Sequence, residues 1–340
     1  MSLFLDAANG KDTPHSPIWI MRQAGRYLPE YRALKEKYTF WELCRDPELA
    51  RDVTLQPIKR FPLDAAILFQ DIMTPLPPMG VKIDFRPGPV FEEPIRSAEM
   101  VDDLRVPEQD EIAPYVTDAI KLIREDSPVP LIGFGGAPLT LATYMIQGGG
   151  SKDYEDFRQF LRYEPEAAHR LLEKLTEVSI RYLTMQVEAG AQAIQLFDSW
   201  AGLHTAPMYK EFALPYNKRV FEALASYDIP RLYIAVNALH LYGEIKTLPC
   251  EVVSIDWRVP ISQVRAQLDG KTVQGNLDPA VLLAPKEVIT KEAERVLKSG
   301  LGGAHIFNLG HGIMKQTDPD HLAHLVDTVH AFDRETARDA

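Results

Sequence analysis

Short, almost continuously apolar segments recur along the chain and alternate with longer segments whose apolar residues return every three or four positions. A continuous apolar run is typical of a strand buried on both faces, as in a parallel sheet, whereas the second pattern is typical of an amphipathic helix. Residues 65–69 show the first pattern. Residues 47–60 show the second, with Asp46 as a helix cap and Pro47 in the first turn. The pattern therefore predicts a parallel α/β fold.

We expect eight strands, each followed by helical sequence. The strands are predicted at residues 17–21, 65–69, 131–134, 193–197, 231–236, 252–255, 272–274 and 304–308. Helical segments are predicted at residues 29–37, 47–60, 112–125, 139–146, 154–189, 239–248, 261–268 and 285–299, with further helix up to 225 and from about 318. Eight βα units favour a (β/α)8 TIM barrel over an open doubly wound sheet, because no G-x-G-x-x-G follows any predicted strand.

One segment departs from this alternation. Residues 73–107 are rich in proline and contain a short predicted hairpin, in which residues 81–85 and 90–91 flank a turn around Pro87. We interpret it as an insertion after the second strand rather than as a separate domain. No linker-like segment interrupts the chain, so we expect a single domain over residues 1–340.

Composition restricts the possible partners and the compartment. Hydrophobic residues make up 46% and charged residues 25% of the 340 residues, as in ordinary soluble globular proteins. The N-terminus lacks the pattern of a signal peptide, and no apolar run reaches the roughly 20 residues that a membrane span needs. The net charge of −11 argues against nucleic acid or an anionic membrane as a partner. Cys44 and Cys250 form no metal or redox spacing and suggest a reducing cytoplasm.

Polar residues follow several predicted strands directly. Arg22 and Arg26 follow the first strand, Asp71 the second, Ser199 the fourth and His311 the eighth. In a TIM barrel, catalytic residues lie at the carboxyl ends of the strands. The sequence therefore predicts that these side chains converge.

Alternation within two strands indicates what surrounds them. Ile67, Phe69 and Asp71 share one face of the second strand, and Phe197 shares a face with Ser199 on the fourth. Asp71 and Ser199 are therefore expected above an apolar wall rather than on the side that faces the helices.

Structural roles are also compatible with these residues. Arg22 and Arg26 form either a clamp for carboxylates or phosphates, or a surface turn whose arginines pair with Glu30 or with a neighbouring helix. Asp71 alone is more often a turn former or helix cap. His311, between two glycines, fits a tight turn or a pocket, and Tyr144 within a predicted helix is by default a core residue.

Longer motifs resemble the uroporphyrinogen decarboxylase family. They are P-I-W-I-M-R-Q-A-G-R-Y-L-P-E-Y-R (17–32), A-A-I-L-F-Q-D-I (65–72), G-F-G-G-A-P-L-T-L-A-T-Y-M (133–145), Q-L-F-D-S-W-A-G (195–202), Q-G-N-L-D-P (274–279) and F-N-L-G-H-G-I (307–313). The resemblance implies a cytoplasmic, usually homodimeric (β/α)8 barrel without metal or organic cofactor. It also implies the reaction of haem and tetrapyrrole biosynthesis that removes CO2 from the four acetate side chains of uroporphyrinogen, leaving methyl groups and giving coproporphyrinogen.

The resemblance also implies roles for individual residues. The implied functional positions are Arg22, Arg26, Asp71, Tyr144, Ser199 and His311, and the implied apolar lining is Ile67, Phe69, Phe134 and Phe197. Of these, Asp71, Arg22, Tyr144 and His311 are the expected catalytic residues. Asp71 would accept hydrogen bonds from the pyrrole N–H groups and stabilise the protonated ring. The proton donor stays open between His311 and Arg22, or a water molecule relayed through Arg22.

Two other functions would share parts of this pattern. Zinc-dependent corrinoid or cobamide methyltransferases resemble the same barrel, but they need a His-x-Cys site and a second cysteine. Neither Cys44 nor Cys250 has a histidine at that spacing. A non-catalytic tetrapyrrole-binding protein would need the arginines and the apolar wall, but it would not need Asp71 or Tyr144.

Overall fold

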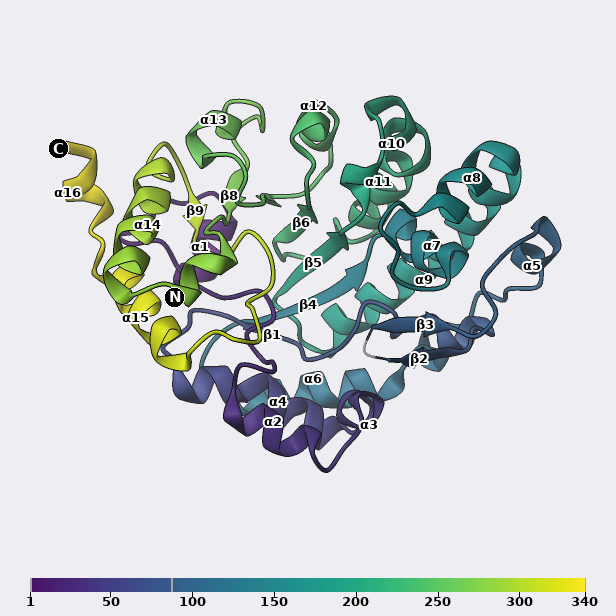
Figure 1. Cartoon of the computed structure of the whole chain (residues 1–340), viewed down its shortest axis with the longest axis horizontal. Helices are drawn as coiled ribbons and strands as arrows, with labels where there is room; N and C mark the ends of the chain where they lie inside the picture. Colours follow the sequence, from purple (N-terminus) through teal and green to yellow (C-terminus); the bar gives the residue numbers. More distant parts are fainter. Residues whose placement is uncertain (1, 87, 340) are drawn as a thin grey trace.

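A curled, seven-stranded parallel sheet forms the centre of the computed structural model, which describes residues 2–86 and 88–339 (Figure 1). Its strand order is β1-β4-β5-β6-β7-β8-β9, and every neighbouring pair is parallel. The strands are β1 (Ala66–Ile67), β4 (Leu131–Gly136), β5 (Ala193–Asp198), β6 (Arg231–Ala235), β7 (Val252–Ser254), β8 (Thr272–Gln274) and β9 (His305–Ile306).

Helices surround the outer side of this sheet (Figure 1). They are α1 (Leu3–Ala8), α2 (Pro29–Lys35), α3 (Phe40–Arg45), α4 (Pro47–Arg60), α5 (Ala98–Asp102), α6 (Pro114–Asp126), α7 (Pro138–Gln147), α8 (Glu155–Tyr163), α9 (Pro165–Ala189), α10 (Ala206–Phe212), α11 (Leu214–Ala223), α12 (Tyr242–Ile245), α13 (Ile261–Arg265), α14 (Lys286–Ser299), α15 (Pro319–Ala331) and α16 (Arg334–Asp339). Within the described ranges, we find no helix with both the length and the apolar character needed to cross a membrane.

The first predicted strand, residues 17–21, is reduced to a single bridge between Ile18 and Phe307. This segment lies between the two edges of the sheet. On the β9 side, Phe307 N–H donates to the Pro17 carbonyl at 2.8 Å, and on the β1 side Asp64 N–H donates to the Ile18 carbonyl at 2.8 Å.

Side chains replace the strand ladder in this segment, which explains why the prediction of a full strand was wrong. The N–H of Ile20 donates to the Gln23 side-chain oxygen at 3.0 Å, and the N–H of Met21 donates to the Asn308 side-chain oxygen at 2.9 Å. These N–H groups are buried and satisfied without a neighbouring strand, so a continuous ladder does not form.

Other predicted elements are shorter or divided. The predicted strands 65–69 and 304–308 shrink to β1 and β9, and the predicted helical region 154–189 is two helices, α8 and α9. The division falls at Pro165, which begins α9, because proline fits the first turn of a helix but not its interior. In contrast, the prediction of a helix at residues 47–60 is confirmed by α4.

Four short helices, α1, α3, α5 and α16, were not predicted. Helix α3 begins with a capping box, in which the Thr39 side chain accepts from Glu42 N–H and the Glu42 carboxylate accepts from Thr39 N–H. The predicted helix 239–248 is a 3-10 turn at Leu239–Leu241 followed by the four-residue α12.

A short antiparallel hairpin lies between β1 and β4 in the sequence. It consists of β2 (Ile83–Phe85) and β3 (Pro89–Phe91), with Ile83 opposite Phe91. Pro87, in the predicted turn, lies outside the described residues. The hairpin brings Phe85 to the side of the cleft described below.

The Asp64 carboxylate connects the first segment to the last long helix. It accepts from Ile18 N–H at 2.7 Å and lies 2.9 Å from Nε2 of His330 on α15. We expect Asp64→Ala to lower the free energy of unfolding by about 1–3 kcal/mol, because it leaves a buried N–H without its acceptor. Chemical denaturation measures this change. Asp118→Ala, on the exposed face of α6, is the control with an expected change below about 0.5 kcal/mol, and equal effects of the two variants would contradict the prediction.

Candidate active site

A cleft of about 720 Å³ opens at the carboxyl ends of the strands. All ten residues singled out in the sequence line it: Arg22, Arg26, Ile67, Phe69, Asp71, Phe134, Tyr144, Phe197, Ser199 and His311. Its other lining residues include Tyr31, Lys35, Phe40, Phe85, Ile313 and Lys315, which the sequence analysis missed.

Arg22 is held in the cleft by an unusual backbone and by a glycine. Its φ angle of +62° places it in the left-handed region, which turns the chain sharply after residue 21. A Cβ atom at Gly312 would lie 2.5 Å from Cδ of Arg22, so only glycine leaves room for the arginine stem beside His311. The N–H of Ile313 donates to the Met21 carbonyl at 3.0 Å and joins the two loops.

The expected alternative, in which these arginines pair with Glu30, does not occur. Glu30 pairs instead with Arg60 at 2.7 Å. Within the described ranges, neither Arg22 nor Arg26 has a carboxylate partner within 4.0 Å. Arg32 supports their loop, because its Nη1 donates to the carbonyls of Arg26 and Tyr27 at 3.0 and 2.9 Å.

Asp71 stabilises a turn by accepting hydrogen bonds, and it also lines the cleft. Its Oδ1 accepts from Met73 N–H at 2.9 Å, and its carbonyl accepts from Thr74 N–H at 3.1 Å, which is the turn-forming role weighed above. For Oδ2, the described part of the chain offers no hydrogen bond. Burial raises the pKa of Asp71 to about 6, against the opposing effects of the Met73 N–H and the charge of Arg22.

His311 is neutral near pH 7. Burial lowers its pKa to about 4, and the positive charges of Arg22 and Arg258 act in the same direction, while Asp256 opposes them. Its ring meets Trp257 edge to face, with ring centroids 6.4 Å apart. In the free protein, His311 is therefore a neutral imidazole and not an imidazolium at neutral pH.

Tyr144 lies in the cleft instead of in the core. It projects from α7, and its ring meets Trp200 edge to face at 5.8 Å, while Trp200 also packs against Tyr154 at 4.5 Å. Burial raises the pKa of Tyr144, so its hydroxyl stays protonated and can donate a hydrogen bond.

Ser199 follows a buried carboxylate that ties α7 to β5. Asp198 accepts from Thr140 Oγ1 at 2.8 Å, from Tyr233 OH at 2.7 Å and from Asn217 Nδ2 at 3.0 Å. Burial raises the pKa of Asp198 in spite of these three donors. Because Thr140 lies one turn before Tyr144 on α7, this network fixes the relative positions of Tyr144 and Ser199.

Aromatic rings form the apolar wall. Phe134 and Phe197 meet edge to face at 5.4 Å, as expected from neighbouring strands, and Phe69 packs against Tyr31 at 5.6 Å and Phe40 at 5.7 Å. Phe40 comes from α3, an element the sequence pattern did not reveal. The wall offers an apolar seat for a ring system.

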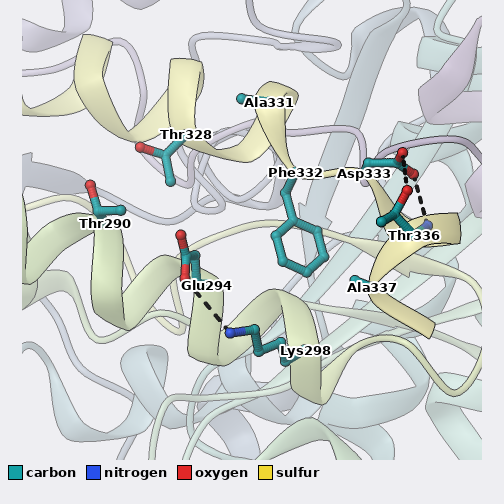
Figure 2. Close-up of a pocket in the computed structure, with 9 residues that line it drawn as sticks. All are labelled: Thr290, Glu294, Lys298, Thr328, Ala331, Phe332, Asp333, Thr336 and Ala337. Carbon is teal, nitrogen blue, oxygen red and sulfur yellow. Dashed lines mark hydrogen bonds and ion pairs between the residues drawn. The ribbon is translucent and has the colours of Figure 1, made fainter. Parts of the chain in front are cut away.

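A second hollow, of about 800 Å³, lies on the outer surface between α14 and α15 (Figure 2). Phe332 points into it between Lys298 and Ala337. Lys298 is paired with Glu294 at 3.7 Å, so its charge is already partnered, unlike those of the arginines in the cleft.

Metal ligands do not cluster in the described residues, where no group of three or more His, Cys, Asp or Glu side chains could hold an ion. Cys44 is fully buried and Cys250 is 4% exposed, and neither lines the cleft.

Comparisons with known proteins show the family to which this chain is similar. The model of the family described as "Uroporphyrinogen decarboxylase (URO-D)" matches residues 1–332. The chain is 46% identical to the uroporphyrinogen decarboxylase of Geotalea daltonii over 98% of this chain and 99% of that protein. It is 48% identical to the Halalkalibacterium halodurans protein of the same name over 97% of this chain and 96% of that protein.

Among solved structures, a methyltransferase from Methanosarcina mazei is similar with a TM-score of 0.82 at 20% sequence identity. The match covers 96% of this chain and 97% of that one. At this identity, the similarity establishes a shared fold and nothing about the reaction.

The raised pKa of Asp71 carries a stability cost. Its folded value of about 6 exceeds the ordinary 3.8, so the unfolded chain releases this proton more readily. The contribution of the Asp71 carboxyl to the stability of the folded state is therefore fully present below about pH 4 and is lost as the pH rises through 6. The difference between these pKa values corresponds to roughly 3 kcal/mol.

We expect Asp71→Asn to raise the free energy of unfolding at pH 7 and to change it little at pH 4. Urea titrations at both pH values measure this, and a gain independent of pH would contradict it.

Proposed function

The chain belongs to the uroporphyrinogen decarboxylase family, and on this premise we propose that its cleft removes CO2 from the four acetate side chains of uroporphyrinogen to give coproporphyrinogen. The observation that carries the proposal is the combination of a partly buried carboxylate, Asp71, with two arginines that have no carboxylate partner among the described residues, beside an aromatic wall. The enzyme is thus a carboxy-lyase of porphyrin and haem biosynthesis.

Each part of the substrate has a counterpart in the cleft. Uroporphyrinogen is a flexible macrocycle with eight carboxylates, four inward-pointing pyrrole N–H groups and apolar ring faces. Arg22 and Arg26 suit the carboxylates, each charge-assisted hydrogen bond contributing about 1.5–3 kcal/mol. Phe134 and Phe197 suit the ring faces. Asp71, whose Oδ2 is not used by the turn, suits the pyrrole N–H donors.

The substrate itself can act as the electron sink. Protonation of the ring carbon beside an acetate gives a cation that accepts the electron pair of the breaking carbon–carbon bond. CO2 leaves, the exocyclic methylene takes up a proton, and loss of the ring proton restores the pyrrole, so that one proton replaces CO2 at each acetate. We propose that the Asp71 carboxylate stabilises the ring cation, which is electrostatic catalysis by a preorganised charge. On this basis the reaction needs neither a metal nor an organic cofactor.

For the proton donor, we favour a water molecule oriented by Arg22. The lowered pKa of His311 argues against a protonated imidazole before substrate binds. Neutral His311, Tyr144 and Ser199 would then hydrogen-bond the substrate and orient it.

The closure of the barrel, the number of domains and the oligomeric state are proposed on the same premise. We propose that residues 17–21 act as the eighth strand of a closed (β/α)8 barrel, since they hydrogen-bond at both edges of the sheet. Residues 1–340 would form one domain, and the family resemblance favours a homodimer in the cytoplasm.

The methyltransferase alternative has less support. It rests on a similarity of fold at 20% identity. A thiolate-ligated metal would need accessible cysteines, whereas burial raises the pKa of the Cys250 thiol to about 12 and Cys44 is fully buried.

An anaerobic assay with uroporphyrinogen tests the proposed function. We expect the purified chain to release four CO2 for each coproporphyrinogen formed, before and after dialysis against a chelator. Unconsumed substrate would contradict the proposed function. Activity lost to the chelator and restored by one particular metal would contradict the metal-free mechanism.

Asp71→Asn separates the turn from the catalytic charge, because asparagine keeps an oxygen for Met73 N–H and loses the negative charge. We expect turnover to fall at least about a hundredfold, or roughly 2.7 kcal/mol, with a modest change in substrate binding. Steady-state kinetics and circular dichroism measure the two effects.

The matched control is Asp118→Asn on the exposed face of α6, which removes the same charge away from the cleft. If turnover of Asp71→Asn stayed within a few-fold of the parent, Asp71 would be a turn former only.

A further inference from the structure

The cleft holds two cations besides the arginines. Lys35 and Lys315 also line it, in a chain whose net charge is −11. Asp71 is the carboxylate that lines the cleft with them. This part of the surface is therefore positively charged against the overall charge of the protein, which favours an anionic ligand with several charged groups.

Lys315 differs from Lys35 in having no partner. The Lys35 ammonium donates to the Tyr38 carbonyl at 3.4 Å, whereas Lys315 has neither an ion pair nor a side-chain hydrogen bond within the ranges that the structure describes. The Lys315 side chain is exposed. An unpaired, hydrated ammonium on a long stem can reach a ligand without first breaking another contact.

The backbone around Lys315 is nevertheless fixed. Ile313 N–H donates to the Met21 carbonyl at 3.0 Å, and Thr317 N–H donates to the Met314 carbonyl at 3.1 Å. Thr317 itself is only 3% exposed. The base of the lysine is thus anchored on the segment between β9 and α15, at the cleft.

The substrate carries more carboxylates than the two arginines can pair with, so a further cation such as Lys315 has a possible partner. Arg22 and Arg26 come from a single loop, and two guanidiniums leave most of the eight carboxylates without a cation. We propose that Lys315 is a carboxylate-binding residue at the rim of the cleft, which pairs with a side chain of the macrocycle that is not reacting. The proposal deepens the proposed function and rests on it.

Equilibrium binding tests this inference without requiring turnover. The probe is uroporphyrin, the stable and fluorescent oxidised octacarboxylate, and the variants are Lys315→Ala and Lys315→Glu. We expect Kd to rise about three- to fivefold for alanine, as an exposed ion pair allows, and about tenfold or more for glutamate. The effect should shrink in about 0.5 M salt, because exposed charges are screened.

Lys291→Glu is the matched control. Lys291 is exposed on α14, outside the cleft, and the change alters the net charge by the same amount. Unchanged Kd values for both Lys315 variants, or an equal rise for Lys291→Glu, would overturn the proposal.

A second probe identifies the carboxylate. Coproporphyrin carries the four propionates and no acetate. An equal effect of Lys315→Glu on both porphyrins assigns a propionate, and an effect on uroporphyrin alone assigns an acetate. The outcomes stay separable from those of the activity assay: a parent chain that binds porphyrin but leaves uroporphyrinogen unconsumed contradicts the proposed function, while the Kd values still decide the role of Lys315. A parent chain that binds neither porphyrin overturns both.

Discussion

The hydrogen bonds of residues 17–21 to both edges of the sheet are the constraint on which the cleft depends. Phe307 N–H donates to the Pro17 carbonyl and Asp64 N–H to the Ile18 carbonyl, so the first segment joins β9 to β1. His311 follows shortly after β9. The hydrogen bond between Phe307 and Pro17 therefore also brings the first segment of the chain beside the carboxyl end of β9. The left-handed turn at Arg22 then lays the arginine stem over Gly312. The same backbone contacts that cover the sheet edges therefore set the distance between Arg22 and His311.

Burial shifts the pKa values of Asp71 and His311 in opposite directions. It raises that of Asp71 to about 6, which leaves the carboxylate mainly ionised at pH 7, and lowers that of His311 to about 4, so the positive charge of the cleft comes from its arginines and lysines. A polycarboxylate would be attracted to those cations and repelled by Asp71. Pyrrole N–H groups would instead stabilise the Asp71 carboxylate. This division of charge would orient the macrocycle, with its N–H groups toward Asp71 and its carboxylates toward the cations.

The sequence predicted elements whose determinants are local. Helix α4 matches its predicted bounds because Asp46 caps it and Pro47 fits its first turn. The residues at the strand ends line one cleft because strand parity decides which face they share. Residues 17–21 differ, since their N–H groups are bound by side chains such as Asn308, nearly 290 residues away. Lys315 comes from the irregular segment between β9 and α15, and Phe85 comes from a hairpin that the sequence predicted without showing that it lies beside the cleft.

The two interpretations of Asp71 are compatible, and this bears on how one fold supports different reactions. One carboxylate oxygen accepts from Met73 N–H and fixes the turn after β1, and that bond holds the other oxygen at the cleft. A group that forms a turn at a strand end is thus positioned for chemistry without further support. The methyltransferase with the same fold shares the scaffold at 20% identity. Here Cys44 stays buried, and its carbonyl accepts from the Gln70 side chain at 2.6 Å, directly beside Asp71 in sequence. The turn after β1 therefore presents a carboxylate to the cleft, whereas the buried Cys44 does not line it, and this arrangement suits stabilisation of a cation.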